Sequence, residues 1–180
     1  MHRSMRVAFC GVLTALCVLL MFMTGLIPVG TYALPAFSGI LLIAAVIELG
    51  ASWAWPVYIA SSALSLLIAA DKEAVMLYIL FFGYYPILKA LIEKKDFPKF
   101  LSYLIKFTVF NVAMVLGYFI SIWVLGVPQD SFVIFGVNLP MVFLILGNIT
   151  FAVYDYAIST LVISYMKKIH KPISRWLHLK

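Results

Sequence analysis

The sequence predicts an all-α integral membrane protein, a bundle of six transmembrane helices that forms a single domain over residues 1–180. Hydrophobic residues make up 65% of the chain and charged residues only 11%, whereas soluble domains are about half apolar and a quarter charged. Apolar stretches near the 20 residues needed to cross a bilayer recur along the chain. Such a chain has too few polar groups to cover a surface in water, so we expect lipid to be its main solvent.

Chain-breaking residues and polar turns delimit the first three spans. The six expected spans are residues 5–27, 36–49, 52–70, 74–92, 99–127 and 139–166. Pro28 and Gly30 end the first span, which we interpret as a retained helix because no small-residue cleavage pattern follows it. Gly50 ends the second span, whose start can alternatively be placed near Tyr32. A polar turn at 71–73 ends the third.

The fourth span contains an unusual aromatic segment over residues 81–86, with sequence FFGYYP. Pro86 has no backbone N–H, so we expect it to kink the helix. Gly83 lets another backbone or a ligand approach closely. The rings around the kink can stack on a flat ligand or simply pack in the core. A polar stretch at 128–131 ends the fifth span, and Lys167 follows the sixth.

The basic residues predict the orientation of the six spans. Every Lys and Arg except Lys72 falls at or near the N-terminus, the connection between the fourth and fifth spans, or the C-terminus. With six spans, these three regions share one side of the membrane. Because Lys and Arg favour the cytoplasmic side, we expect both termini to be cytoplasmic and the protein to lie in the cell membrane. The tail, with apolar residues at Ile169, Ile173, Trp176 and Leu177, predicts either an amphipathic surface helix or a solvated basic segment.

Small residues form a stripe on one face of the first span. They are Ser4, Ala8, Gly11 and Ala15, at helical spacing. Small side chains let a second helix approach closely, which favours helix association in lipid. The stripe therefore predicts either docking of a partner helix or packing within the bundle.

Two polar residues of the sixth span are candidates for a ligand site. Asp155 lies deep in the span, where a carboxylate is costly unless it is paired or faces a cavity. Asn148 lies on nearly the same face and closer to the outside. The pair predicts a polar wall of an outward-facing site. The alternative for Asp155 is an internal hydrogen bond to Tyr84, Tyr85 or Asn111.

Several kinds of chemistry have no motif in this sequence. It contains no HExxH, GxSxG, paired acidic metal motif or P-loop. We therefore expect no enzymatic activity, no cofactor and no binding of ATP by this chain. The histidines all lie near the termini, which disfavours a metal site within the bundle. The basic residues are not interleaved with aromatics, which disfavours nucleic-acid binding.

Three parts of the sequence carry a resemblance to a known family. They are the stripe Ser4/Ala8/Gly11/Ala15, the segment PVGTYALPAFSG at 28–39, and the segment DKEAVMLYILFFGYYPILK at 71–89. With the chain length, six spans and basic tail, they resemble the substrate-binding S component of an energy-coupling factor (ECF) transporter. The stripe departs from the AxxxA-type pattern of that family, since serine and glycine replace two alanines.

The resemblance implies a function and a set of partners. S components capture a vitamin or similar micronutrient, and uptake is coupled to a transmembrane scaffold (T) subunit that carries two ABC-type ATPases. In that family the stripe on the first helix docks on the scaffold, which would be the role of Ser4, Ala8, Gly11 and Ala15.

The resemblance also implies a ligand pocket that opens to the outside. Carried onto this sequence, it consists of Tyr32, Tyr78, Phe82, Trp123, Asn148 and Asp155. No signature of a particular vitamin is present, so the substrate is not specified. The alternatives are a stand-alone secondary carrier and a structural membrane protein that binds no ligand.

Overall fold

A computed structural model describes residues 3–27, 30–95, 97–124, 126, 128, 133–134, 137–168, 170 and 173. Six stretches of these residues are helices long and apolar enough to cross a membrane, which confirms the predicted all-helical fold. The fourth stretch combines two α-helices and a π-helical turn. The elements in order are α1 (Arg3–Met23), α2 (Gly30–Leu49), α3 (Ala51–Ile68), α4 (Lys72–Leu77), the π-helical turn (Tyr78–Phe82), α5 (Tyr85–Lys94), α6 (Lys99–Trp123), β1 (Val133–Ile134), β2 (Val137–Asn138) and α7 (Leu139–Lys168).

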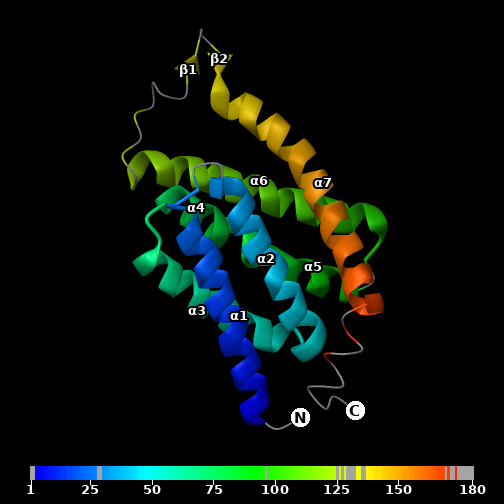
Figure 1. The fold of residues 1–180 in the computed structure, drawn as a ribbon. Helices are drawn as coiled ribbons and strands as arrows, with labels where there is room; N and C mark the ends of the chain where they lie inside the picture. Colours follow the sequence, from blue (N-terminus) through cyan, green and yellow to red (C-terminus); the bar gives the residue numbers. More distant parts are fainter. Residues whose placement is uncertain are drawn as a thin grey trace.

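The helix α2 occupies the middle of the bundle (Figure 1). It packs against α1 and α3 on one side and against α4, α5 and α7 on the other. The Oε1 atom of Glu48, in the last turn of α2, lies 3.1 Å from Nδ1 of His170, just beyond α7. The end of α7 therefore lies with the end of α2 and the start of α1. We call this the terminal end of the bundle, and the opposite end, which carries β1 and β2, the hairpin end.

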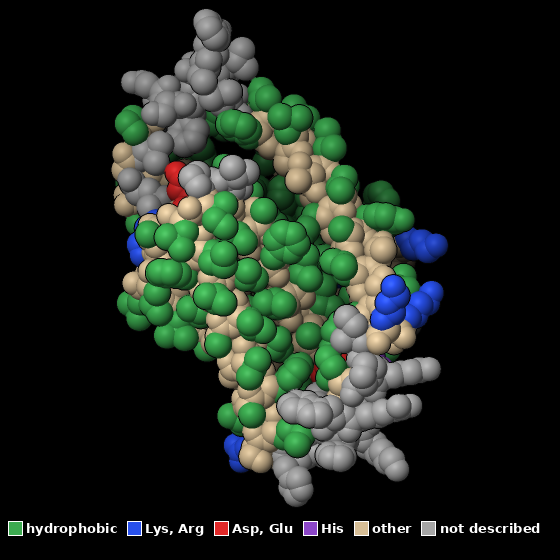
Figure 2. All heavy atoms as spheres, in the orientation of Figure 1, with side chains coloured by type: hydrophobic (Ala, Val, Ile, Leu, Met, Phe, Trp, Pro, Cys, Tyr) green, Lys and Arg blue, Asp and Glu red, His purple; other side chains and the backbone are tan. Residues whose placement is uncertain are grey.

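Apolar side chains dominate both the interior and the exterior of the bundle. A buried aromatic cluster joins the fourth span to α6 and α7, with Phe81 edge-on to Phe110 and to Phe151. The rings of Phe110 and Phe151 stack at 4.8 Å between centroids. Figure 2 shows the outer surface covered by hydrophobic side chains, with Lys and Arg at its margins. A surface of this kind is compatible with lipid as solvent.

The fourth span is interrupted just before Pro86, where the sequence predicts a kink. The π-helical turn Tyr78–Phe82 precedes the break, and α5 restarts with Pro86 in its first turn. Pro86 cannot donate to the carbonyl of Phe82 one turn earlier. The backbone of Gly39 in α2 lies directly against that carbonyl, because a Cβ at Gly39 would lie 2.1 Å from the Phe82 oxygen. Gly83 in turn accommodates the ring of Tyr58, 2.7 Å from its would-be Cβ.

Several helix limits differ from those expected. The second helix begins at Gly30 rather than at residue 36, close to the alternative start near Tyr32. Pro35 lies inside this helix because its missing N–H removes only one backbone hydrogen bond near the helix start. The fifth helix ends at Trp123 rather than at residue 127. Of the predicted amphipathic tail, residues 169, 171–172 and 174–180 lie outside the described residues.

Candidate functional site

A hollow at the hairpin end is the candidate ligand site of this structure. Its volume is about 450 Å³, within the usual range of small-molecule sites. It lies between the start of α2, the α4 segment, the last turns of α6 and the first turns of α7. Figure 2 shows the surface hollowed at this end, beside α7 and next to acidic side chains.

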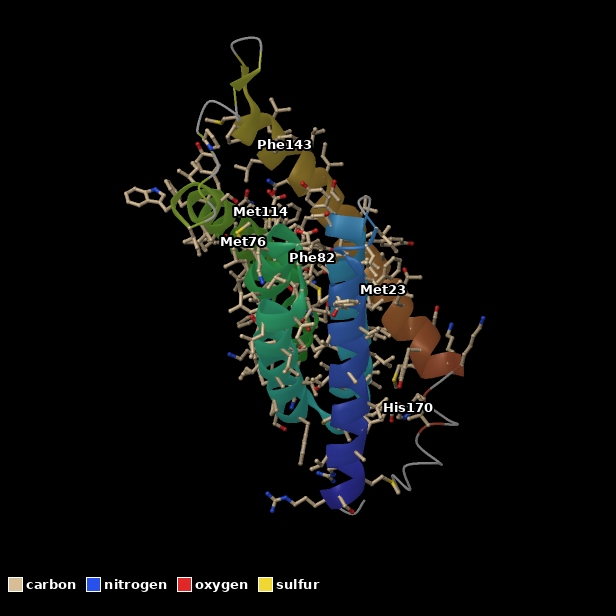
Figure 3. All side chains as sticks on the ribbon, turned by 60° about the vertical axis from the view of Figure 1, so that its left-hand side comes forward. Met23, Met76, Phe82, Met114, Phe143 and His170 are labelled. Atoms are coloured by element: carbon tan, nitrogen blue, oxygen red, sulfur yellow. The ribbon has the colours of Figure 1, made fainter. Side chains whose placement is uncertain are left out.

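Divergence of α6 and α7 creates this hollow. The two helices approach closely at Gly147, where a Cβ would lie 3.2 Å from the ring of Phe110. Toward the hairpin end they separate, and Gly117 adds no side chain to the space between them. Figure 3 shows Met76, Met114 and Phe143 toward the hairpin end, away from His170.

The lining of the hollow is mostly apolar and includes several aromatic and thioether side chains. Its rings and thioethers come from four elements of the fold and belong to Tyr32, Tyr118, Phe119, Phe143, Met76 and Met114. The polar lining includes Ser121, whose hydroxyl donates to the sulfur of Met76 at 3.9 Å, and the carboxylate of Glu73. Such a surface suits a small ring compound with few polar groups.

A reciprocal pair of asparagines joins α6 and α7 near the base of the hollow. The Nδ2 atom of Asn111 donates to Oδ1 of Asn148 at 2.9 Å, and Nδ2 of Asn148 donates to Oδ1 of Asn111 at 2.9 Å. Each amide also donates to the backbone carbonyl one turn earlier in its own helix. All four amide N–H groups therefore have acceptors within the bundle.

A cluster of four charged side chains lies nearer the terminal end, between α5, α6 and α7. The carboxylate of Asp155 contacts the ammonium of Lys89 and lies 3.4 Å from that of Lys106. Glu93 lies 3.0 Å from Lys89 and 2.8 Å from Lys106. The hydroxyl of Tyr85 donates to Asp155 at 2.6 Å. The side chains of both lysines are buried, and the two positive and two negative charges balance.

The internal hydrogen bond considered for Asp155 is therefore present, with Tyr85 as the donor. The ion pairs with Lys89 and Lys106 were not expected from the sequence. One sequence signal does point to them: Tyr85, Lys89 and Glu93 are four residues apart and share one helix face. Lys106, the partner of Asp155 in α6, has no comparable signal in the nearby sequence.

The structure brings together only some of the residues named for the ligand pocket. Tyr32 lines the hollow. Tyr78 is fully buried, with its hydroxyl 2.8 Å from that of Ser61. Phe82 is partly buried and packs against the apolar core. Trp123 is 83% exposed at the end of α6 and does not belong to the lining described above.

Several lining residues were not singled out from the sequence. They are Glu73, Met76, Met114, Tyr118, Phe119, Ser121 and Phe143. A partial signal exists in α6, where Met114, Tyr118 and Ser121 recur at helical spacing in the half of the span next to the polar loop. That spacing alone does not distinguish a cavity wall from a lipid-facing surface.

The small-residue stripe of α1 faces outward. Ser4, Ala8, Gly11 and Ala15 are all exposed, and a Cβ at Gly11 would have nothing within 4 Å. The opposite face of α1 carries its buried residues, Leu13, Cys17 and Met21. Packing of the stripe against other described helices of this chain is therefore not observed.

Within the described residues, no group of three or more His, Cys, Asp or Glu side chains is arranged to hold a metal ion. No protein-family model, curated protein or solved structure matches this chain.

Proposed function

We propose that the chain is an integral membrane protein that crosses the cell membrane six times, with both termini in the cytoplasm. Six apolar helices and an apolar outer surface support the insertion. Arg3 and Lys168 lie at the terminal end, whereas Lys72 lies beside the hollow-lining segment of α4. By the distribution of basic residues, the terminal end then faces the cytoplasm and the hairpin end faces outward.

In this orientation the hollow opens to the outside and captures a small micronutrient there. The observation that carries this proposal is the position of the hollow, a cavity of about 450 Å³ at the end of the bundle where Lys72 is the one basic residue of the described part of α4. Its rings and thioethers provide an apolar surface for a flat compound, and its few polar groups provide orientation. Asp155 lies about 16 Å along the axis of α7 from Leu144, which lines the hollow. It therefore acts as a partner within the bundle, bonded to Tyr85, rather than as a contact of the ligand.

The proposed mode of uptake is that of an ECF S component, coupled to a scaffold subunit and its ATPases. The exposed stripe of α1 supports a docking role, because its small side chains are exposed and a Cβ at Gly11 would have nothing within 4 Å. Without a nucleotide-binding motif, the chain depends on a partner or an ion gradient for energy.

A stand-alone carrier driven by an ion gradient is the second candidate. The charge cluster of Lys89, Glu93, Lys106 and Asp155 favours it, because ionisable networks within a membrane often carry protons in transporters. The two candidates differ in their energy requirement. A carrier takes up its substrate alone, whereas an S component requires the scaffold and ATP.

Small molecules retained by the gently purified protein test the proposal directly. We expect mass spectrometry to find one compound retained by the wild-type protein and, after Ser121→Phe, retained roughly tenfold less because the ring occupies the hollow. Val124→Phe is the matched control, since Val124 is exposed and lies one turn beyond the lining. Absence of any retained compound, or equal retention by both variants, would contradict capture in the hollow.

A further inference from the structure

Two of the three charged residues that begin the fourth span are engaged in capping helices. Asp71 accepts hydrogen bonds from the backbone N–H of Ala74 at 3.0 Å and from the hydroxyl of Thr31 at 2.8 Å, so it caps α4 and ties it to α2. The ammonium of Lys72 donates to the carbonyls of Leu66 at 2.8 Å and Ala69 at 3.0 Å, at the end of α3. The ammonium of Lys72 is thereby held against α3, and Lys72 does not line the hollow.

The third charged residue, Glu73, lines the hollow. Its side chain is exposed, and it makes no hydrogen bond or ion pair with another described residue. No lysine or arginine is present among the described lining residues.

The remainder of the lining also favours positive charge. Aromatic faces attract cations when the cation lies within about 6 Å of the ring, and the hollow has rings from Tyr32, Phe119 and Phe143. The thioethers of Met76 and Met114 are polarisable and adapt to irregular ring compounds. A carboxylate that shares a hollow with apolar and aromatic side chains attracts an organic cation and repels a carboxylate or phosphate ester.

We propose that the hollow selects a small cationic compound, an aromatic or heteroaromatic ring bearing an amine or quaternary nitrogen, and that Glu73 is the residue that sets this charge preference. This inference rests on the proposed function, because it assumes that the hollow is the capture site. It adds the chemical class of the substrate and the residue that recognises its charge. The ring packs among the aromatic and thioether side chains, and the cationic nitrogen lies toward Glu73 at the mouth.

A retention experiment with three proteins tests the charge preference. Wild-type protein and the variants Glu73→Gln and Glu73→Asp are incubated with the same filtrate of yeast extract, washed, and analysed for released compounds by mass spectrometry. We expect the wild-type protein to retain a compound that is cationic at pH 7, and Glu73→Gln to retain roughly tenfold less of it. Glu73→Asp keeps the charge and shortens the side chain, so we expect it to retain most of the compound.

Salt provides a second measurement with the purified compound. Because Glu73 is exposed, its attraction for a cation is screened by salt. We expect the affinity of the wild-type protein to fall as NaCl is raised from 0.05 to 0.5 M, and that of Glu73→Gln to change less.

The outcomes separate this inference from the proposed function. A neutral or anionic retained compound that is lost in Ser121→Phe would overturn the charge preference and leave capture in the hollow intact. A cationic compound retained equally by wild-type and Glu73→Gln proteins would overturn the role of Glu73. Absence of any retained compound would overturn the proposed function and this inference together.

Discussion

The side chains of Asn111 and Asn148 exchange two hydrogen bonds, each of 2.9 Å, between α6 and α7. The pair lies where the two helices are close, and beyond it they diverge around the hollow. Within apolar surroundings such a reciprocal pair fixes the register of the helices, because sliding either helix leaves amides without partners. The hollow therefore depends on a polar contact that does not itself line it.

The effects of replacing Asn111 and Asn148 on the free energy of unfolding should not be additive. Replacement of either residue alone should remove more than half of the stability that is lost when both are replaced. We expect Asn148→Ala to lower the free energy of unfolding by about 1–3 kcal/mol, because Asn111 then keeps only one of its hydrogen-bond partners. Replacement of both residues by alanine should cost less than the sum of the single alanine changes, with a coupling of about 0.5–2 kcal/mol. Denaturation in detergent, analysed as a double-mutant cycle, measures this coupling. Additive single changes would show that the two amides act independently.

Removing one positive and one negative charge from the charge cluster together should destabilise the protein less than removing a single charge. Asp155→Asn keeps the shape of the side chain but leaves Lys89 and Lys106 with Glu93 alone. We expect a loss of up to about 3–5 kcal/mol, reduced by the water that reaches half-exposed Glu93. Lys89→Met combined with Asp155→Leu removes one charge of each sign, so it should lower the free energy of unfolding less than Asp155→Asn does.

Denaturation in detergent compares the stability of Asp155→Asn with that of the double variant Lys89→Met/Asp155→Leu. Retention of the compound in the hollow is the second measurement. We expect retention per folded molecule to be unchanged, because Asp155 lies far from the lining. A loss of affinity in Asp155→Asn at unchanged stability would instead place Asp155 in the ligand site.

Two glycine-to-alanine changes should have opposite outcomes. At Gly39 a Cβ would lie 2.1 Å from the carbonyl oxygen of Phe82, a backbone atom that cannot move without shifting the fourth span. We expect Gly39→Ala to destabilise the protein by roughly 1–3 kcal/mol or more. Gly11→Ala is the control, because nothing lies within 4 Å of its Cβ and alanine favours the helix. Similar thermal denaturation curves for the two variants would contradict the close packing of α2 on Phe82.

A bulky residue in the stripe of α1 should block coupling without affecting capture. The space around Gly11 accommodates a tryptophan in the isolated protein, so Gly11→Trp should retain the compound in the hollow. In cells that also express a scaffold subunit and its ATPases, we expect uptake to be abolished, because the ring prevents close helix approach. Ala8→Trp should behave in the same way.

The control for the stripe is Leu16→Trp. Leu16 is 41% exposed on the same helix, but it lies roughly 100° around the axis from the stripe. Uptake by this variant should be near normal. Joint loss of retention and uptake in Gly11→Trp would mean that the stripe supports the fold of this chain and not a partner.

Thiol labelling in intact cells tests the orientation. In a background with Cys10→Ala and Cys17→Ala, we expect Pro128→Cys to react with a membrane-impermeant thiol reagent, because Pro128 is exposed and lies beyond the end of α6 that flanks the hollow. Lys180→Cys should react only after the cells are permeabilised. The reverse pattern would invert the proposed topology.

Local sequence properties determined the class of this fold and the number of its apolar helices. Hydropathy and helix breakers act over a few residues, so six spans and the interruption near Pro86 could be predicted from the chain alone. Helix limits depend also on packing between helices. The second span, expected over 36–49, begins at Gly30 and contains Pro35, because a helix that packs on several neighbours tolerates the loss of one hydrogen bond.

Contacts between distant segments decided the candidate site, and only the tertiary structure contains them. Asp155 was recognised in the sequence as a buried carboxylate, but its partner Lys89 lies 66 positions away, and the packing of α5 on α7 determines which charge it meets. Glu73 belongs to a polar turn that, in the sequence, looks like any connection between spans. It lines a hollow because α6 and α7 diverge opposite α4. A cavity is the space that packed helices leave between them, so no local pattern of residues specifies it.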